Sequence, residues 1–373
     1  MKIAVDARCL AEPNLTGVGM YAMNLLQTLL QIDNKNEYIF FSTGLKNDLL
    51  KTRVQSAPNA RVRIVKVPNK LIALSDALFC APKIETILRE HVDLVFAPNF
   101  NRLRINGKTP FVLTVHDLSF ELFPEYFSRR MLTWHKLVRA KSLCEQASAI
   151  ICPSESTKQD ICIIYKIEPN KIHVIPHGAA CANQTNSDTE KKDAIVCIGT
   201  IEPRKNIVSV IKAYERVREE TEYDMPLVII GSLGWKYGNV LRAVKHSKFR
   251  DSIIFTGYLT QEQKQNAIAN AKLLLFPSFY EGFGMPLLEA QCLGAPVIAS
   301  RTSSMPEAVK HSAILIDPNN VRDIARAINA VLKDNALQSA LSLDGRVNAQ
   351  SFSWLTTAQK TLTVFQQTAR QQA

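Results

Sequence analysis

Two glutamates and two glycines stand close together in the stretch FYEGFGMPLLEA, residues 279–290. Glu281 and Glu289 offer carboxylate oxygens, which accept hydrogen bonds from hydroxyl groups, and a buried core segment has no use for two of them. Gly282 and Gly284 lack a Cβ atom, so the backbone amides around them can approach a phosphate closely. These residue types in this order indicate a segment that binds a ligand with both hydroxyl groups and phosphate.

The same stretch contains the start of a predicted helix. Pro286 suits the first helical position, and Gly294 suits the position just after the helix. Glu281 then lies in the preceding loop and Glu289 about one turn into the helix. The free N–H groups at the helix start favour an anion. A sugar nucleotide supplies sugar hydroxyls, a diphosphate and a ribose; the simpler alternative, a solvated Glu281 before a capped helix, leaves both glycines unexplained.

Two adjacent cations could bind the diphosphate. Arg204 and Lys205 lie in GTIEPRKN, residues 199–206, directly after a predicted strand, and Asn206 is a candidate N-cap for the next helix. A guanidinium and an ammonium suit a leaving group whose negative charge grows in the transition state. The alternative is a solvated surface pair. The position at the ligand-binding edge of a sheet favours the first interpretation.

The first half of the chain offers a second set of candidates. Gly17 and Gly19 join the first predicted strand to a helix and could bring amides onto a phosphate, although Ala22 interrupts the full dinucleotide-binding fingerprint. His116 and Asp117 follow another strand, so they are expected at the ligand edge. A histidine there can bond a sugar hydroxyl or carry a proton, and the alternative is a structural histidine.

Short apolar strands alternate with helical stretches, and the pattern restarts after residue 180. Such alternation predicts parallel sheets covered by helices on both faces, hence an α/β protein with two Rossmann-like halves and a cleft between them. The polar segment 181–193 reads as a linker or exposed loop. The predicted strands are residues 2–8, 37–43, 61–67, 93–98, 111–117, 149–154, 171–179, 194–200, 226–232, 252–258, 272–278, 296–300 and 313–318.

Composition narrows the class of protein. The chain has 373 residues, 46% of them hydrophobic and 21% charged, and a formal net charge of +11, which calls for an acidic partner. No apolar run reaches the roughly 18 residues that span a bilayer, and we expect a cytoplasmic protein.

The eight cysteines form no CxxC pair, so we expect reduced core thiols. We expect no metal, since no Asp-x-Asp or P-loop motif occurs, and no nucleic acid, since no basic stripe is interleaved with aromatics.

The order of these motifs resembles glycosyltransferase family 4, a retaining family of the GT-B fold. The resemblance rests on Gly-x-Gly near the start, HD in the middle, EPRKN, and EGFGMPLLEA, and it covers essentially the whole chain. HDLSFELFPEYFS and GTIEPRKN look like the branch of bacterial O-antigen and polysaccharide mannosyltransferases. VIPHGA resembles the family's segment at the start of the second domain, which usually has Asn in place of His177.

The resemblance implies a role for each candidate in the first domain and for the two cations. Gly17 and Gly19 would approach the diphosphate, and His116, followed by Asp117, would lie at the 6-hydroxyl of the donor sugar. Arg204 and Lys205 would stabilise the leaving diphosphate. His116, Arg204, Lys205 and Glu281 form the predicted catalytic set, and the other named residues are expected to bind the donor.

The remaining donor contacts come from the EGFG segment. Glu281, with the amides of Phe283 and Gly284, would hold the donor sugar, and Glu289 would hold the ribose. The chain departs from the family at Thr200, where many members carry an arginine. In this chain Arg204 would fill the role of that arginine.

The resemblance also implies domain limits and a reaction. The first domain would comprise residues 1–176 plus a C-terminal helix, about 357–373, that crosses back to it, and the second domain residues 177–356. A hexose, most simply mannose from GDP-mannose, would pass to a glycan hydroxyl with retention at the anomeric carbon, in surface-polysaccharide or O-antigen synthesis. UDP- or dTDP-sugar donors, a GT-B sugar-nucleotide epimerase and a non-catalytic glycan-binding protein remain alternatives.

A basic stretch suggests how a glycan acceptor linked to a lipid such as undecaprenyl could be reached. Residues 127–143 read as one amphipathic helix that could dock on an anionic membrane. A helix packed on its apolar side and solvated on the other fits the same pattern. The cations concerned are Arg129, Arg130, Lys136, Arg139 and Lys141.

Overall fold

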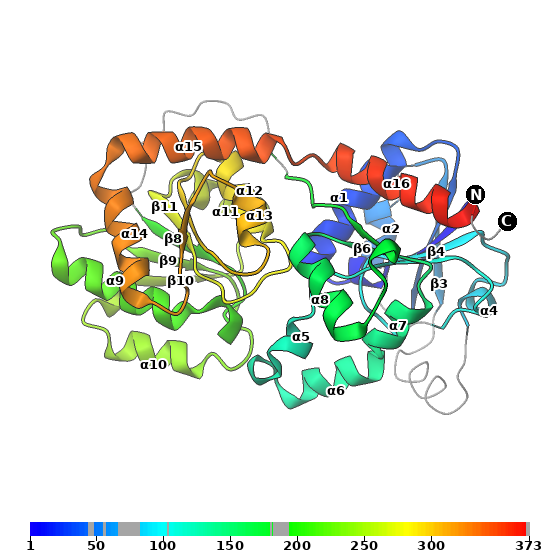
Figure 1. The fold of residues 1–373 in the computed structure, drawn as a ribbon, viewed down its shortest axis with the longest axis horizontal. Coiled ribbons are helices and arrows are strands. Elements are labelled where there is room, and N and C mark those ends of the chain that lie inside the picture. The colour runs from blue at the N-terminus through cyan, green and yellow to red at the C-terminus, as the bar shows by residue number, and fades with distance from the viewer. Residues whose placement is uncertain are drawn as a thin grey trace. The chain divides into compact units, whose positions relative to one another are not determined.

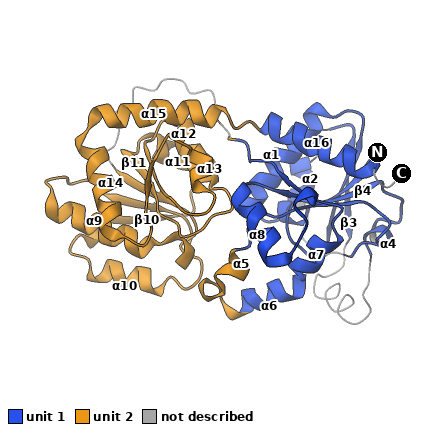
Figure 2. Cartoon of the chain, viewed as in Figure 1, with its two compact units in different colours: residues 1–118, 130–178, 354–373 blue, residues 119–129, 179–353 orange. Residues whose placement is uncertain are grey.

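The computed structural model describes residues 1–43, 48–54, 57–65, 83–102, 104–179, 181 and 194–370. The chain divides into two compact units, coloured separately in Figure 2. Unit 1 consists of Met1–Leu118, Arg130–Gly178 and Trp354–Ala373, and unit 2 of Ser119–Arg129 and Ala179–Ser353. Each unit contains a parallel sheet covered by helices (Figure 1), so the predicted α/β class with two Rossmann-like domains is confirmed.

The sheet of unit 1 has seven strands in the order β3-β2-β1-β4-β5-β6-β7. Neighbouring strands run parallel, and the central ones are short apolar runs that are buried along their whole length, as expected for a sheet covered on both faces. The strands are β1 (Lys2–Asp6), β2 (Glu37–Thr43), β3 (Ala60–Val65), β4 (Leu94–Ala97), β5 (Phe111–Thr114), β6 (Ala149–Cys152) and β7 (Ile172–Val174).

Helices from both ends of the chain cover this sheet. The last helix, α16, packs on α1, and its Phe365 and Val364 join the core beneath β1 and β4. The helices of unit 1 are α1 (Gly17–Ile32), α2 (Asp48–Val54), α4 (Ile84–Leu88), α6 (Arg129–Val138), α7 (Ala140–Gln146), α8 (Glu155–Tyr165) and α16 (Trp354–Arg370).

The sheet of unit 2 has six strands in the order β10-β9-β8-β11-β12-β13. Side chains of β8 alternate between two cores: Ile195 and Cys197 pack on one face, and Val196 and Ile198 on the other. The strands are β8 (Ile195–Ile198), β9 (Leu227–Ile230), β10 (Ile253–Gly257), β11 (Leu273–Phe276), β12 (Val297–Ser300) and β13 (Ile314–Ile316). Each predicted strand overlaps an observed one.

Two helical layers follow from that alternation. Helices α9 and α14 pack together on one face, and α12 and α15 on the other. The helices of unit 2 are α5 (Ser119–Leu122), α9 (Ile207–Glu220), α10 (Gly238–His246), α11 (Gln261–Ala269), α12 (Met285–Cys292), α13 (Met305–Val309), α14 (Val321–Lys333) and α15 (Asn335–Gln350).

Residues 119–129 group with unit 2, although the predicted division kept them in the first domain. The indole N–H of Trp235 donates to the Tyr126 carbonyl at 2.7 Å, and the rings of Trp235 and Phe127 stack with centroids 5.9 Å apart. Tyr126 also stacks on Phe279, at 5.8 Å. These aromatic contacts hold the segment on the loops of unit 2. The sequence of the segment shows no apolar periodicity that would have predicted them.

Two local predictions are wrong. The stretch 127–143 is two helices, α6 and α7, because Arg139 between them has the left-handed φ of 55°. The expectation of reduced cysteines fails for Cys181 and Cys292, which form a disulfide with Cα atoms 5.1 Å apart. Cys181 is the first residue of the predicted linker, and the rest of the linker, residues 182–193, lies outside the described residues. Cys80 also lies outside them. Cys9, Cys144, Cys152, Cys162 and Cys197 carry reduced thiols.

Candidate active site

The sheet of unit 2 reverses its direction of winding between β8 and β11. These strands are hydrogen-bonded neighbours, but the chain proceeds from β8 to β9 on one side and from β11 to β12 on the other. Open α/β sheets bind ligands beyond the carboxyl ends of the strands at such a point. The segments that follow β8 and β11 carry Arg204, Lys205 and Glu281, so the topology brings these three predicted residues to one edge.

Glu281 lies between the two predicted cations. Nη1 of Arg204 donates to Oε2 of Glu281 at 2.6 Å, and Nζ of Lys205 donates to Oε1 at 2.5 Å. Nη2 of Arg204 donates to Oε1 of Glu202 at 2.8 Å. The charges therefore alternate in sign in a cluster whose side chains are at most 14% exposed. We name Glu202, Arg204, Lys205 and Glu281 the charge cluster.

The cluster fixes the protonation state of Glu281. Burial would raise the pKa of this carboxyl, but Arg204 and Lys205 outweigh burial and lower the pKa to about 2. Glu202 behaves differently, because burial raises its pKa even though the same two cations oppose the change. Glu281 is consequently an anion at neutral pH, with both carboxylate oxygens occupied by N–H donors.

The two cations differ in what they can still offer a ligand. Arg204 also donates from Nη1 to the Tyr280 carbonyl at 2.9 Å, so its guanidinium is tied to three protein acceptors. Lys205 has three N–H groups, of which one reaches Glu281. Its Nζ lies 4.8 Å from the centroid of the Phe276 ring. Lys205 is therefore the cation that retains donors for a diphosphate.

Hydroxyl groups from the segment after β12 hold the backbone of Glu281. The Ser304 hydroxyl donates to the Glu281 carbonyl at 2.8 Å, and the Ser303 hydroxyl donates to the same oxygen. The Glu281 N–H donates to the Ser303 hydroxyl at 3.2 Å. The sequence analysis did not identify Ser303, Ser304 or Glu202. The two serines could have been suspected, because the run Thr302–Ser304 directly precedes a helix.

Gly284 determines where α12 begins. Its φ of 93° lies in the left-handed region that favours glycine, and a Cβ there would come within 2.9 Å of Cδ1 of Leu287. Helix α12 starts at Met285 with Pro286 in its first turn, and Gly294 follows its end with a φ of 74°. The neighbouring Phe283 is buried, and the binding of a donor by its amide and that of Gly284 stays a prediction.

Glu289 lies on α12 and is paired away from the charge cluster. Its Oε2 lies 2.8 Å from Nζ of Lys264 on α11, and both side chains are about one-fifth exposed. A capping box formed by Thr260 and Gln263 fixes the start of α11. Lys264 is therefore a partner of Glu289 that the sequence analysis did not identify.

Asn206 does not cap α9 as predicted. It has a left-handed φ of 57° and makes no side-chain cap. Its amide Nδ2 donates instead to the carbonyls of Pro277, at 3.1 Å, and Pro318, at 2.7 Å. Asn206 thus ties the loop after β8 to the loop after β11, which helps to hold the charge cluster together.

The remaining predicted residues belong to unit 1. His116 is partly buried after β5, and its Nε2 lies 2.8 Å from the Pro98 carbonyl. Its ring packs edge-on against Tyr21, at 4.7 Å, and His177, at 5.5 Å. Burial lowers the pKa of both histidines, and for His177 the neighbouring His116 adds to the effect. His116 is therefore neutral and held in an aromatic cluster that the sequence analysis did not foresee.

In the described part of the chain, the surroundings of three further predicted residues show no contact that requires a ligand: Asp117, Gly17 and Gly19. Asp117 is partly exposed next to His116. Gly17 is the first residue of α1, and Gly19 is buried, with Leu15 so close that a Cβ would come within 2.9 Å of Leu15 Cδ2. Packing therefore explains Gly19 without a ligand, and the approach of these glycines to a diphosphate stays a prediction.

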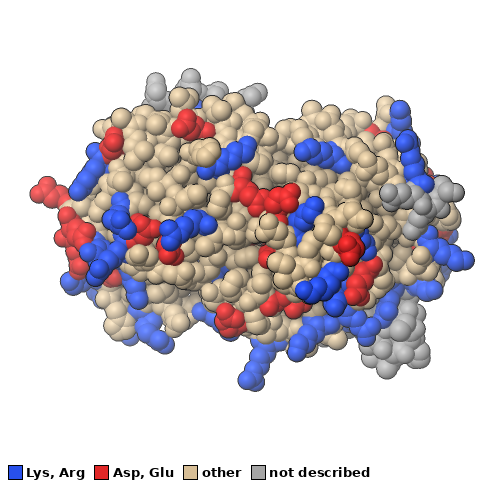
Figure 3. Space-filling view, in the orientation of Figure 1, with Lys and Arg blue, Asp and Glu red and all other residues tan. Residues whose placement is uncertain are grey.

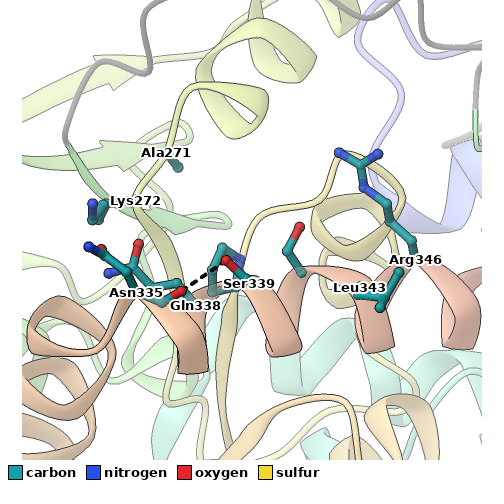
Figure 4. A pocket seen from close by; sticks show the side chains of 9 residues that line it. Ala271, Lys272, Asn335, Gln338, Ser339, Leu343 and Arg346 are labelled. Atoms are coloured by element: carbon teal, nitrogen blue, oxygen red, sulfur yellow. Dashed lines mark hydrogen bonds between the residues drawn. The ribbon is translucent and has the colours of Figure 1, made fainter.

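Two pockets occur in unit 2. One, of about 470 Å³, lies along α15; its lining includes Lys272, Gln338, Ser339, Leu343 and Arg346, and none of the predicted site residues (Figure 4). The other, of about 670 Å³, lies between α9 and α10. Within the described ranges, no three His, Cys, Asp or Glu side chains are grouped to hold a metal ion.

The surface shows mixed charge. Lys and Arg side chains are interspersed with Asp and Glu over the face seen in Figure 3. In the part of the chain that the structure describes, no helix combines the length and hydrophobicity needed to cross a membrane.

Comparisons with known proteins agree with this geometry. "Glycosyltransferase Family 4" matches residues 15–182, and "Glycosyl transferases group 1" matches residues 182–347. A solved structure of the Anabaena protein Alr3699/HepE, with UDP and glucose, shares the fold with a TM-score of 0.74 at 18% identity, over 98% of this chain and 100% of that one. Fold and site together define a glycosyltransferase with the GT-B architecture.

The chain belongs to the glycosyltransferases of group 1 and family 4. It is 27% identical to O-antigen chain mannosyltransferase B of Escherichia coli, over 98% of this chain and 99% of that protein. It is 30% identical to the serotype-specific mannosyltransferase WbdA of Escherichia coli, over 57% of this chain but only 28% of that protein. The predicted family is thereby confirmed, and the predicted resemblance to O-antigen mannosyltransferases is found in these two relatives.

Proposed function

We propose that this protein is a retaining mannosyltransferase that moves mannose from GDP-mannose to a hydroxyl of a glycan in surface-polysaccharide synthesis, on the cytoplasmic side of the membrane. The observation that carries the proposal is the charge cluster at the switch point of unit 2, where Glu281 is held between Arg204 and Lys205. The names of two relatives, both O-antigen or serotype-specific mannosyltransferases, support mannose.

Each member of the cluster has a part in this proposal. Lys205 directs its remaining N–H groups to the leaving diphosphate, whose charge grows in the transition state. Arg204 keeps Glu281 in place, and Glu281 accepts hydrogen bonds from the hydroxyls of the donor sugar. Glu289 binds the ribose, and His116 lies at the 6-hydroxyl. In this proposal no metal takes part, and the N–H groups of Lys205 that Glu281 leaves unused bind the diphosphate.

The proposed reaction proceeds on one face of the sugar. The bond between the anomeric carbon and the phosphate oxygen breaks, the acceptor oxygen bonds to that carbon from the same side, and the acceptor proton passes to the leaving phosphate. Glu281 is a poor candidate for a covalent nucleophile because both its oxygens accept N–H bonds from cations. Trapping a covalent sugar–enzyme adduct would contradict this mechanism.

A thermal-shift panel tests the donor. Purified protein is heated with GDP-mannose, UDP-glucose, a dTDP-hexose or an ADP-hexose, each at saturating concentration. A ligand at 100 times its dissociation constant stabilises a protein by about 2.7 kcal/mol, so the true donor is expected to give the largest rise. A largest rise with a UDP-sugar would overturn GDP-mannose; this second candidate is favoured by the solved structure that contains UDP and glucose. Release of free nucleotide without any acceptor glycan would favour an epimerase.

The proposed acceptor is a lipid-linked glycan, reached by docking of α6 on the membrane. This helix contains no acidic residue, and its Trp134 and Leu137 are 43% and 49% exposed. Exposed apolar side chains among cations suit an anionic bilayer surface. The cations are Arg129, Arg130 and Lys136 on α6, and Arg139, which follows it.

Co-sedimentation with liposomes tests the membrane contact. Binding is expected to require anionic lipid, to weaken with salt, and to fall several-fold when both Trp134 and Leu137 are changed to alanine. Leu343→Ala is the matched control, since Leu343 is an exposed leucine of unit 2, at 65%. Sedimentation that responds neither to anionic lipid nor to the double variant would exclude docking through α6.

A further inference from the structure

The 670 Å³ pocket of unit 2 is a groove between the start of α9 and the length of α10, and we name it the α9–α10 groove. None of the residues predicted to bind the donor lines it. Tyr126 and Phe279, which belong to different segments of unit 2, also line it. The polar residues of its lining include Glu202, Ser209, Lys236, Asn239, Arg242 and His246.

The groove combines an apolar floor with groups that bond hydroxyls. Ser209 and Asn239 provide a hydroxyl and an amide from facing helices, and Tyr126 provides a phenol. The Tyr126 ring already stacks on Phe123, at 5.4 Å, and on Phe279, at 5.8 Å. Since its ring faces are engaged within the protein, the groove is poorly suited to stack a nucleobase. Its polar groups suit the hydroxyls of a saccharide better.

The rim of the groove is basic. Lys236, Arg242 and His246 line it, and the single carboxylate of the lining, Glu202, is already paired with Arg204 at 2.8 Å. Lys236 has a left-handed φ of 54°, which is uncommon for a side chain of this size, and its Nζ donates to the Glu125 carbonyl at 2.5 Å. The local potential therefore favours an anion beside the saccharide.

We propose that the α9–α10 groove binds a saccharide that carries a phosphate group, at a site separate from that of the nucleotide-sugar donor. The groove shares a wall with the charge cluster, because Glu202 is bonded to Arg204 and the Phe279 N–H donates to the Arg204 carbonyl at 2.9 Å. A saccharide in the groove would therefore lie next to Glu202, a member of the cluster. The groove gives the enzyme a second contact with phosphorylated glycan, whatever the base of the donor.

Isothermal titration with mannose 6-phosphate tests this site on the full-length protein. The titration is run with and without the nucleoside diphosphate that gives the largest thermal shift, at saturation, so that the donor site is filled in one arm. Mannose 6-phosphate is expected to bind in both arms. Arg242→Gln is expected to weaken binding at least fivefold, whereas Lys245→Gln, an exposed cation of α10 outside the lining, leaves it unchanged.

Further arms separate the saccharide from the anion. Neutral mannose and inorganic phosphate are each expected to bind at least fivefold more weakly than mannose 6-phosphate. Phosphate alone binding as tightly would reduce the groove to an adventitious anion site. Equal effects of Arg242→Gln and Lys245→Gln, full competition by the nucleoside diphosphate, or no binding in either arm would overturn the proposal. None of these results depends on which nucleotide sugar is the donor.

Discussion

Arg204 and Lys205 are neighbours in the sequence, yet their side chains have different surroundings. The guanidinium of Arg204 is bonded to Glu202, Tyr280 and Glu281, all within the protein. The ammonium of Lys205 donates to Glu281, and within the described residues its other N–H groups reach no protein acceptor. At the scale of single residues, substitutions of Arg204 and of Lys205 are therefore expected to have different effects.

Removing the ammonium of Lys205 tests this difference. Lys205→Ala is expected to lower kcat by about 10²–10³-fold, the usual effect of losing a donor that acts on developing charge, while the protein remains folded. Arg204→Lys is expected to lower thermal stability as well, since Glu281 and Glu202 would lose a shared partner inside a buried cluster. Steady-state kinetics and thermal unfolding measure both effects.

The matched control is Lys212→Ala, which removes an exposed cation from α9. It is expected to match the wild type in both measurements. Wild-type kcat in Lys205→Ala, with the fold intact, would remove Lys205 from the mechanism.

Two histidines of unit 1 predict a loss of stability in mild acid. Burial lowers the pKa of His116 and His177 below the value near 6.5 that they have in the unfolded chain. The unfolded state therefore binds more protons than the folded state, and the free energy of unfolding decreases as the pH falls below about 6.5. Glu281 adds a separate loss only at lower pH, between about 4.5 and 2.

Denaturant unfolding between pH 7.5 and 5 measures the effect. His177→Asn is expected to flatten this pH dependence, because it removes one buried group that must take up a proton on unfolding. His311→Asn, at an exposed position of unit 2, serves as the control. A pH dependence in His177→Asn as steep as in the wild type would contradict the assignment.

Part of the site could be predicted residue by residue, and part could not. Glu281, Arg204 and Lys205 were identifiable because charged residues after apolar strands are expected at the ligand edge. Their mutual pairing was not, since it depends on loops that are more than 70 residues apart in the sequence. Glu202 escaped notice for the same reason: its burial and its bond to Arg204 exist only in the folded sheet.

At the scale of elements, an ion pair joins α11 to α12, in addition to the apolar core that they share. Lys264 on α11 lies 2.8 Å from Glu289 on α12, and each helix has its own fixed start, a capping box for α11 and the left-handed Gly284 for α12. Lys264 therefore positions the carboxylate that we assign to the ribose.

Lys264→Gln is expected to raise KM for the donor about two- to fivefold with little change in kcat. The pair is about one-fifth exposed, so its worth is about 1 kcal/mol or less. Kinetics of Lys264→Gln, Glu289→Gln and the double variant give the coupling energy, which is expected to exceed about 0.5 kcal/mol for residues in contact. Strictly additive effects would show that Lys264 does not act through Glu289.

The elements themselves were largely predictable, and their irregular ends were not. Short apolar runs identified the strands, since residues of a sheet buried on both faces must be apolar. The break between α6 and α7 arises from the left-handed conformation of Arg139, a residue type that gives no such signal. Asn206 looked like an N-cap, but its amide is used to tie two loops together.

At the scale of the whole molecule, the chain passes between the units at residues 118–119, 129–130, 178–179 and 353–354. Just after the passage at 178–179, the Cys181–Cys292 disulfide cross-links unit 2 between residues 111 positions apart. Sequence spacing could not reveal this pair, because neither cysteine has a partner nearby in the chain.

The disulfide predicts that reductant destabilises the protein. A cross-link that closes a loop of about 100 residues restricts the unfolded chain by up to about 4.7 kcal/mol, so reduction is expected to lower the unfolding temperature by several degrees. Cys292→Ser is expected to unfold at the lower temperature with or without reductant, whereas Cys162→Ser, which removes a free thiol, keeps the response. Thermal unfolding measures both variants, and peptide mapping under non-reducing conditions detects the bond. Two free thiols at Cys181 and Cys292 in protein purified without reductant would show that unit 2 is held by packing alone.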